Sequence, residues 1–186
     1  AQFDPATATL RVFELARLGA LANNPHGIFF DFRSHLTPRI WVVHRNALGP
    51  GSGQGNSQSD GNVGALTYID VNTNQVVTYD FRTVAAAAGI DEKMFKDIHA
   101  VFVDARGTVW LTAHGEIPAI IELDFDEPPD GASPGRINTH TATLRVHKVP
   151  HRHDPSDESA HLHPHALQVV VDNDPNGNGE TYVWFI

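Results

Sequence analysis

Three histidines occupy matching places along this chain and are the residues best suited to bind a metal. His26, His99 and His165 each open a segment of the form His, small residue, apolar run, and they lie 73 and 66 residues apart. Imidazole nitrogen is a good ligand for Zn, Cu, Fe and Ni. If the fold gathers the three segments, they would form a divalent metal site; Zn, Mg, Cu and Fe are not distinguished. The alternative is structural: a buried ring that hydrogen-bonds neighbouring backbone.

A second group of histidines comes just before the third segment. The stretch HRHDPSDESAHLHPH ends at His165 and contains His163 two residues earlier. In an extended chain, His-x-His places two rings on one side, a spacing that favours chelation. We therefore expect His163 to be a further metal ligand. The alternative is a solvated loop that meets metal only adventitiously.

Other polar residues are candidates for catalysis or for a second ion. His44 and His114 follow the two Trp-containing runs and could serve as a general base or a fourth ligand, since imidazole titrates near neutral pH. Glu116 could be an acid or a ligand. The stretch DNDPNGNGE offers calcium oxygen ligands, or else it is an ordinary hairpin turn rich in Asn and Gly; those ligands would be Asp172, Asp174 and Asn176.

The elements that must position these residues are predicted to be β-strands. Each of the three segments has an apolar run ending in Asp, a turn, and a second apolar run that contains Trp, which is typical of a β-hairpin. ALTYIDV with VVTYDF, and AIIELDF with TATLRVHKV, add a second pair of strands after the first two segments. The repeating unit is thus four antiparallel strands, and the chain is predicted to be all-β.

Four-stranded units repeating along a chain are the signature of a β-propeller. We expect a single propeller portion over residues 1–186. It would hold a partial blade at 1–15, a blade at 26–83, a blade at 99–149 and an incomplete blade at 165–186. The start of each innermost strand lies near a propeller's axis, which would gather the histidines there. An open β-sandwich with coincidental repeats is the alternative fold.

The hexapeptide TATLRV occurs twice, at residues 7–12 and 141–146. The second copy reads as an outer strand, so the first copy is predicted to be an outer strand without inner strands of its own. It would complete the last blade, or an interrupted blade on a partner. About three blades are too few for a ring of four to eight. We therefore expect a larger ring that is completed by a second chain, a second copy or a nicked polypeptide.

Composition excludes several classes of partner. The net charge of −9 argues against nucleic acid, which requires a basic face. No apolar run approaches the roughly 20 residues that span a bilayer. The absence of cysteine is compatible with export, and a start without Met fits removal of a signal peptide. The predicted location is therefore extracytoplasmic, either periplasmic or secreted.

The stretches NPHGIFFD, HAVFVDARGTVWLTAHGE and HPHALQVVVD…YVWFI together resemble the repeats of virginiamycin B lyase and related propellers. The resemblance covers most of the chain outside the insertions. It implies a β-propeller, a divalent metal, a histidine base and a glutamate near the channel mouth, with elimination at an ester. Val43-His44 in the first repeat and Ala113-His114 in the second stand where that family's repeat has its glutamate, and the repeat's Ile-Gly-Arg-Ile is absent.

These observations together predict a metal-dependent lyase or hydrolase that acts on an ester, lactone or related small molecule in a histidine-lined axial site. The metal would act as a Lewis acid, and a histidine would remove a proton. Two alternatives remain open. One is a propeller that binds a ligand or a protein without catalysis, and the other is a redox enzyme with an all-histidine metal site.

Overall fold

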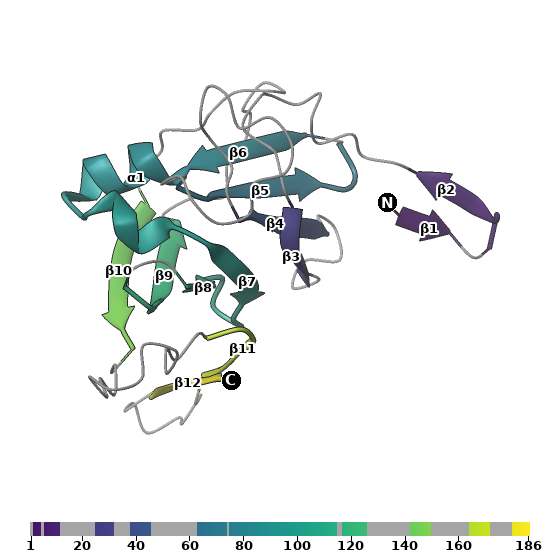
Figure 1. Ribbon diagram of the computed structural model, residues 1–186. Coiled ribbons are helices and arrows are strands. Elements are labelled where there is room, and N and C mark those ends of the chain that lie inside the picture. Colours follow the sequence, from purple (N-terminus) through teal and green to yellow (C-terminus); the bar gives the residue numbers. More distant parts are fainter. Residues whose placement is uncertain are drawn as a thin grey trace, which may run out of the picture.

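The described residues of the computed structural model form mainly β-strands, with one short α-helix (Figure 1). The all-β prediction is confirmed at this level. Among the described residues, no helix is both long and apolar enough to cross a lipid bilayer. The structure describes residues 2–4, 6–11, 25–31, 38–45, 63–73, 75–114, 117–125, 142–149, 164–171 and 180–186.

The first sheet is a four-stranded antiparallel meander in the order β3-β4-β5-β6. The apolar runs of the first repeat form its strands because β-branched and aromatic residues suit a pleated, buried surface. Three of the four strands are almost completely buried. The strands are β3 (Pro25–Asp31), β4 (Arg39–His44), β5 (Ala65–Asp70) and β6 (Val76–Asp80).

The second sheet repeats this arrangement in the order β7-β8-β9-β10. Leu-Arg-Val-His in the last strand alternates between half-buried and exposed positions, as an outer strand should. The predicted unit of four antiparallel strands is therefore present in two successive copies. The strands are β7 (Ile98–Val103), β8 (Val109–Ala113), β9 (Ala119–Phe125) and β10 (Ala142–Lys148).

Two hairpins complete the β-structure of the described residues. The third repeat forms β11 (Leu167–Val171) and β12 (Thr181–Phe185), which pair with each other. The first TATLRV contributes β2 (Thr9–Arg11), which pairs with β1 (Gln2–Asp4). In Figure 1 the β1–β2 hairpin lies apart from the β11–β12 hairpin. The sheets do not close into a ring within the described residues.

The core lies between the two four-stranded sheets. Trp41 and Tyr68 of the first sheet belong to the same buried cluster as Leu111 and Ile121 of the second. At the inner strands, Phe29 of β3 packs against Phe102 of β7, with ring centroids 4.9 Å apart. The sheets therefore pack face to face, and β3 lies beside β7.

A short helical connection joins the two sheets. The chain forms α1 (Phe81–Ala88) followed by a 3₁₀-helix at Glu92–Phe95. Asp80 caps α1 by accepting a hydrogen bond from the backbone N–H of Arg82. Phe81 and Phe95 stack beneath this connection, with centroids 5.2 Å apart. The connection thus extends the core and delivers the chain to the start of β7.

The Asp residues that end the apolar runs organise the turns. Asp104 is buried, and its Oδ1 accepts hydrogen bonds from the backbone N–H groups of Arg106, Gly107 and Thr108. Its Oδ2 accepts a hydrogen bond from Trp110 Nε1 at 3.1 Å. An Asp side chain that binds backbone a few residues ahead is a common device for making a turn. This Asp and this Trp of the repeat are therefore structural partners.

Candidate metal centre

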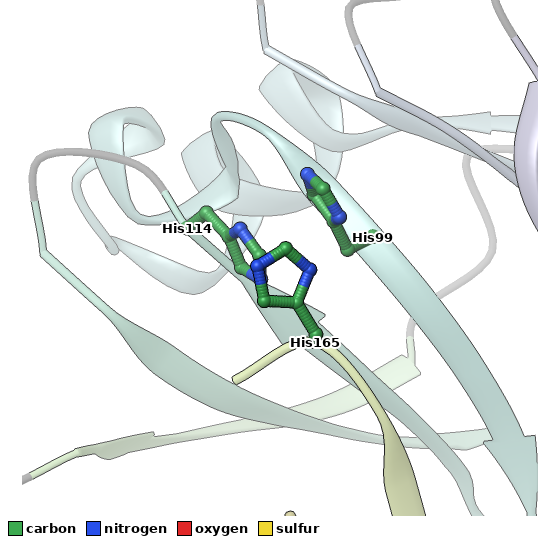
Figure 2. A group of neighbouring side chains, drawn as sticks. All are labelled: His99, His114 and His165. Carbon is green, nitrogen blue, oxygen red and sulfur yellow. The ribbon is translucent and has the colours of Figure 1, made fainter. Parts of the chain in front are cut away.

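His99, His114 and His165 form a cluster in which one nitrogen from each ring lies within 4.8 Å of the other two. His99 belongs to β7, His114 directly follows β8, and His165 lies just before β11. Figure 2 shows the three side chains pointing toward one another from these separate segments. The structure therefore brings together two of the predicted metal ligands, His99 and His165, with the predicted fourth ligand or base, His114.

The three rings contact each other directly. The rings of His99 and His114 are stacked, with centroids 3.7 Å apart and planes 12° from parallel. His165 meets both edge-on, with centroids 5.0 Å from His99 and 4.4 Å from His114. Nitrogens bound to one tetrahedral zinc lie about 3.4 Å apart, given Zn–N bonds of about 2.1 Å. Binding would thus require the rings to close by about an ångström.

Two β-bulges occur where the repeated histidines stand. The register of β3 against β4 shifts between Pro25 and Ile28, around His26. The register of β7 against β8 shifts at the corresponding place, around His99. A bulge bends its strand and re-aims the side chains within it. The same local irregularity therefore presents the repeated histidine at the start of both inner strands.

His114 is held by two hydrogen bonds. Its Nε2 donates to the backbone carbonyl of Pro164 at 2.9 Å, and its backbone N–H donates to the carbonyl of Asp97 at 3.1 Å. A neutral ring with its proton on Nε2 has its lone pair on Nδ1. Metal-bound histidines commonly donate their other N–H to a carbonyl in this way. The Pro164 contact also fixes the segment that carries His165.

Asp97 contacts both His99 of the cluster and Arg45. Its carboxylate is paired with the guanidinium of Arg45 through Nε and Nη2, and the Nη2–Oδ2 distance is 3.0 Å. Oδ1 lies 3.3 Å from Nε2 of His99. That nitrogen is buried and makes no well-directed hydrogen bond within the described part of the chain. Asp97 has a left-handed backbone, with φ of 55°. In metal sites, the histidine that binds the metal often contacts a carboxylate through its other ring nitrogen.

Electrostatics keep His99 in a form that can bind a cation. Burial and the neighbouring His114 lower the pKa of His99 to about 4, against the opposing effect of Asp97. Burial alone would raise the pKa of Asp97, but the hydrogen bond and charge of Arg45 outweigh it and the pKa is lowered. Near neutral pH, His99 is therefore an uncharged imidazole next to an ionised carboxylate.

The donor set suits a transition metal. Three neutral imidazoles match Zn, Cu, Fe or Ni rather than the hard ions Mg and Ca, which prefer oxygen. His99 and His114 are buried, whereas His165 is exposed. A metal held by these three residues could keep a further coordination position on the solvent-facing side for water or substrate, as catalytic zinc sites do.

His26 lies next to the cluster but outside the set of three. Its ring packs on that of His99, with centroids 4.2 Å apart, and Nδ1 donates to the backbone carbonyl of His99 at 3.2 Å. The side chain is exposed. This contact is the structural role considered for the repeated histidine, and it involves Nδ1 rather than Nε2 of the ring.

His44 occupies a different position from His114. It is completely buried, and its Nε2 lies 2.8 Å from the hydroxyl of Thr67, which in turn contacts Thr78. His44 pairs with Ala65 in the first sheet, and Ala113 pairs with Ala119 at the equivalent position of the second sheet. His44 therefore corresponds to Ala113. The position that corresponds to His114 is one residue later in the first sheet. The remaining predicted site residues lie outside the described residues: Glu116, His163, Asp172, Asp174 and Asn176.

Sequence reasoning missed Asp97 and Arg45. Asp97 stands two residues before His99, and Arg45 directly follows His44, so neither spacing suggested a pair. Comparison of the chain with protein families, curated proteins and solved structures found no match. The resemblance to virginiamycin B lyase therefore stays a prediction, and the chemistry rests on the histidine cluster.

Proposed function

We propose that the two four-stranded sheets and the β11–β12 hairpin are successive blades of a β-propeller. Three relations support this arrangement. Inner strand β3 lies beside β7, and β7 lies beside β11, so equivalent strands are neighbours in chain order. Each inner segment opens with a histidine, and His26, His99 and His165 follow one another through ring contacts. Radial sheets with their first strands at a common axis would produce this chain of contacts.

We further propose that His99, His114 and His165 hold one divalent transition metal and that the protein is a metal-dependent lyase or hydrolase. The observation that carries this proposal is the convergence of three imidazoles, two of them buried, from three separate segments. A metal there would polarise the carbonyl of an ester or lactone substrate. The resemblance of the repeats to virginiamycin B lyase favours elimination over hydrolysis.

His26 is the best-placed base for either reaction. It is exposed beside the cluster, and its Nδ1–H is directed to the carbonyl of His99. In elimination, Nε2 would take a proton from the carbon next to the one that bears the ester oxygen. The C–H electrons would form a C=C bond as the C–O bond breaks and the carboxylate leaves. In hydrolysis, the same nitrogen would take a proton from water.

Metal analysis of the purified full-length chain tests the proposal. We expect one tightly held Zn or Co per chain, with Co²⁺ giving the visible absorption of a nitrogen-ligated site. The side chain of His165 is exposed, so the His165→Ala variant should fold. This variant should nevertheless bind the metal at least a hundredfold more weakly. His147→Ala, an exposed histidine of β10 outside the cluster, is the matched control. Unchanged affinity in His165→Ala, or no bound metal, would overturn the proposal.

Turnover separates the enzyme from its alternatives. A panel of esters and lactones should be opened by the metal-loaded protein and not after chelation. His26→Gln should lower kcat while metal content stays at one per chain. Tight metal binding without turnover would favour the ligand-binding propeller, and reduction or oxidation of a bound Cu or Fe would favour the redox alternative.

A further inference from the structure

The β1–β2 hairpin has the same sequence pattern and register as the outer hairpin of the second sheet. In β1–β2, Phe3 pairs with Leu10 and Asp4 with Thr9. In β9–β10, Leu123 pairs with Leu144 and Asp124 with Thr143. The second strand of both hairpins comes from the same hexapeptide, TATLRV. The first hairpin is therefore an outer pair of strands of the kind that completes a four-stranded sheet.

The third sheet has inner strands but no outer pair among the described residues. Strand β12 pairs only with β11, so its other edge is open there. Ala166 and Ile186 exchange both backbone hydrogen bonds. Because such pairs alternate along an antiparallel ladder, the N–H groups of Val183 and Phe185 point to the open edge. An open strand edge is a template for adding another strand.

A pocket marks the place where an outer hairpin would lie. It measures about 450 Å³ and lies between the second sheet and β12, with Ile120 and Val149 on one side and Val183 and Phe185 on the other. On the opposite face of the second sheet, Ile121 and Leu123 of β9 are buried against the first sheet. The same two strands, β9 and β10, thus have one face covered and one face open toward the third sheet.

We propose that the β1–β2 hairpin of a second copy of this chain pairs with β12, and that two copies exchange these hairpins to close a ring. The described residues of each copy then supply two four-stranded sheets, one inner pair and one outer pair. Two copies give six four-stranded sheets, within the range of four to eight for propellers. The proposal rests on the propeller arrangement above and is independent of the metal site.

Exposed apolar side chains support a second copy as the occupant. Ile28 and Phe30 of β3 are 56% and 47% exposed, and Tyr182 and Trp184 of β12 are 47% and 66% exposed. In a two-fold ring, each copy's third sheet would lie against the partner's first sheet, so both apolar faces are covered in a self-complementary interface.

The second sheet also predicts the register of the exchange. Trp110 of β8 pairs with Glu122 of β9. By register, Trp184 corresponds to Trp110, and Gln2 corresponds to Glu122. Gln2 of one copy should therefore stand opposite Trp184 of the other. Because the N–H of Val183 points to the open edge, Gln2 and Trp184 fall at a non-hydrogen-bonded position. Cα atoms at such positions lie about 4.5 Å apart, close enough for a disulfide.

Engineered cysteines test the exchange cleanly because the chain has no cysteine of its own. Full-length Gln2→Cys and Trp184→Cys, produced with different tags and mixed, should form a covalent heterodimer on mild oxidation. Gln2→Cys mixed with Ala87→Cys, an exposed site on α1, is the control and should not. The double variant Q2C/W184C should give a covalent dimer. A monomer with an internal disulfide, or no disulfide, would overturn the proposal.

Sedimentation provides an independent test. The unmodified chain should sediment at twice the 20.3 kDa of one copy. Leu10→Asp on the hairpin and Val183→Pro on the receiving edge should each produce single copies. Ala87→Asp adds the same charge as Leu10→Asp and should leave the dimer intact. Circular dichroism must show that the variants keep their strands. The exchange would be contradicted if the unmodified chain had the mass of a single copy. It would also be contradicted if Leu10→Asp and Val183→Pro both folded and still formed dimers.

Discussion

His99 and His114 stack face to face, with ring centroids 3.7 Å apart, at the open end of the β7–β8 hairpin, where β7 begins and β8 ends. The two rings are also buried. Two buried imidazoles in contact cannot both be protonated without strong repulsion. The stack therefore favours neutral rings, and its pH dependence can be measured.

We expect the metal-free protein to become more stable between pH 4 and pH 6.5. The pKa of His99 falls from 6.5 to about 4 on folding. The unfolded chain therefore binds more protons in this window, so the contribution is complete above pH 6.5 and is lost as the pH falls to about 4. This contribution to the free energy of unfolding amounts to at most about 3 to 4 kcal/mol, taking about 1.4 kcal/mol for each of the roughly 2.5 pH units between the two pKa values. Urea unfolding with a chelator present measures it.

The comparison variants isolate His99 from other groups that titrate in acid. His99→Gln should lose this part of the pH dependence. His147→Gln, an exposed ring on β10, should retain it. Identical pH profiles for His99→Gln and the unmodified protein would contradict the assignment.

Asp97→Asn should weaken metal binding about 10- to 100-fold, the usual effect of removing a second-layer carboxylate. Asn tolerates the left-handed backbone that Asp97 adopts, so the carbonyl that accepts the N–H of His114 should stay in place. Isothermal titration with Zn²⁺ measures the change. Asp91→Asn, which alters a capping carboxylate away from the cluster, is the control. Unchanged affinity in Asp97→Asn would show that the carboxylate plays no part.

Gly27→Ala should destabilise the fold by about 3 kcal/mol or more through overpacking. A Cβ at Gly27 would overlap the carbonyl oxygen of His99 and approach Val43 Cγ2 to 2.9 Å. Relief requires β3 to move away from β7, which would also separate His26 from His99. Gly89→Ala is a useful comparison, because a Cβ there meets nothing within 4 Å and only the φ of 66° is strained. It should cost about 1 kcal/mol. If Gly27→Ala and Gly89→Ala lost similar amounts of stability in chemical unfolding, the close approach of Gly27 to His99 would be contradicted.

Asp104→Ala should cost about 3 kcal/mol or more, because several donors around a buried carboxylate lose their acceptor at once. These donors include Trp110 Nε1 and the backbone N–H of Thr108. Asp124→Ala, on an exposed part of β9, should change stability by no more than about 0.5 kcal/mol. Thermal unfolding with Trp fluorescence reports both the stability and the environment of Trp110. Equal stabilities of the two variants would rule out this role for Asp104.

Strands were predictable from the sequence because apolar runs and turn residues alternate with a regular period. The four strands of each complete unit follow directly from that pattern, and Leu-Arg-Val-His identified β10 as an outer strand. Short turns bounded by Asp made the pairing of neighbouring runs clear, as at Asp104. These features are local, so a single sequence carries them.

The site was only partly predictable because it depends on register and on long-range contacts. His44 and His114 looked equivalent, but a difference of one register position separates their surroundings. Asp97 meets Arg45 across 52 residues, and its contact with His99 depends on a left-handed backbone. Spacing along the chain cannot reveal either relation, whereas the repeated His at the start of each segment predicted His99 and His165 as neighbours.

His165 reaches the cluster from the C-terminal hairpin, whereas His99 and His114 belong to the second sheet. An ion bound by all three would be a reversible cross-link between two parts of the chain that are otherwise joined by a long connection. Closing that loop is entropically unfavourable, so part of the binding energy would appear as stability of the hairpin's attachment. The concentration of free metal in the surroundings would then set how firmly the last strands are fastened, and chelation would loosen them first.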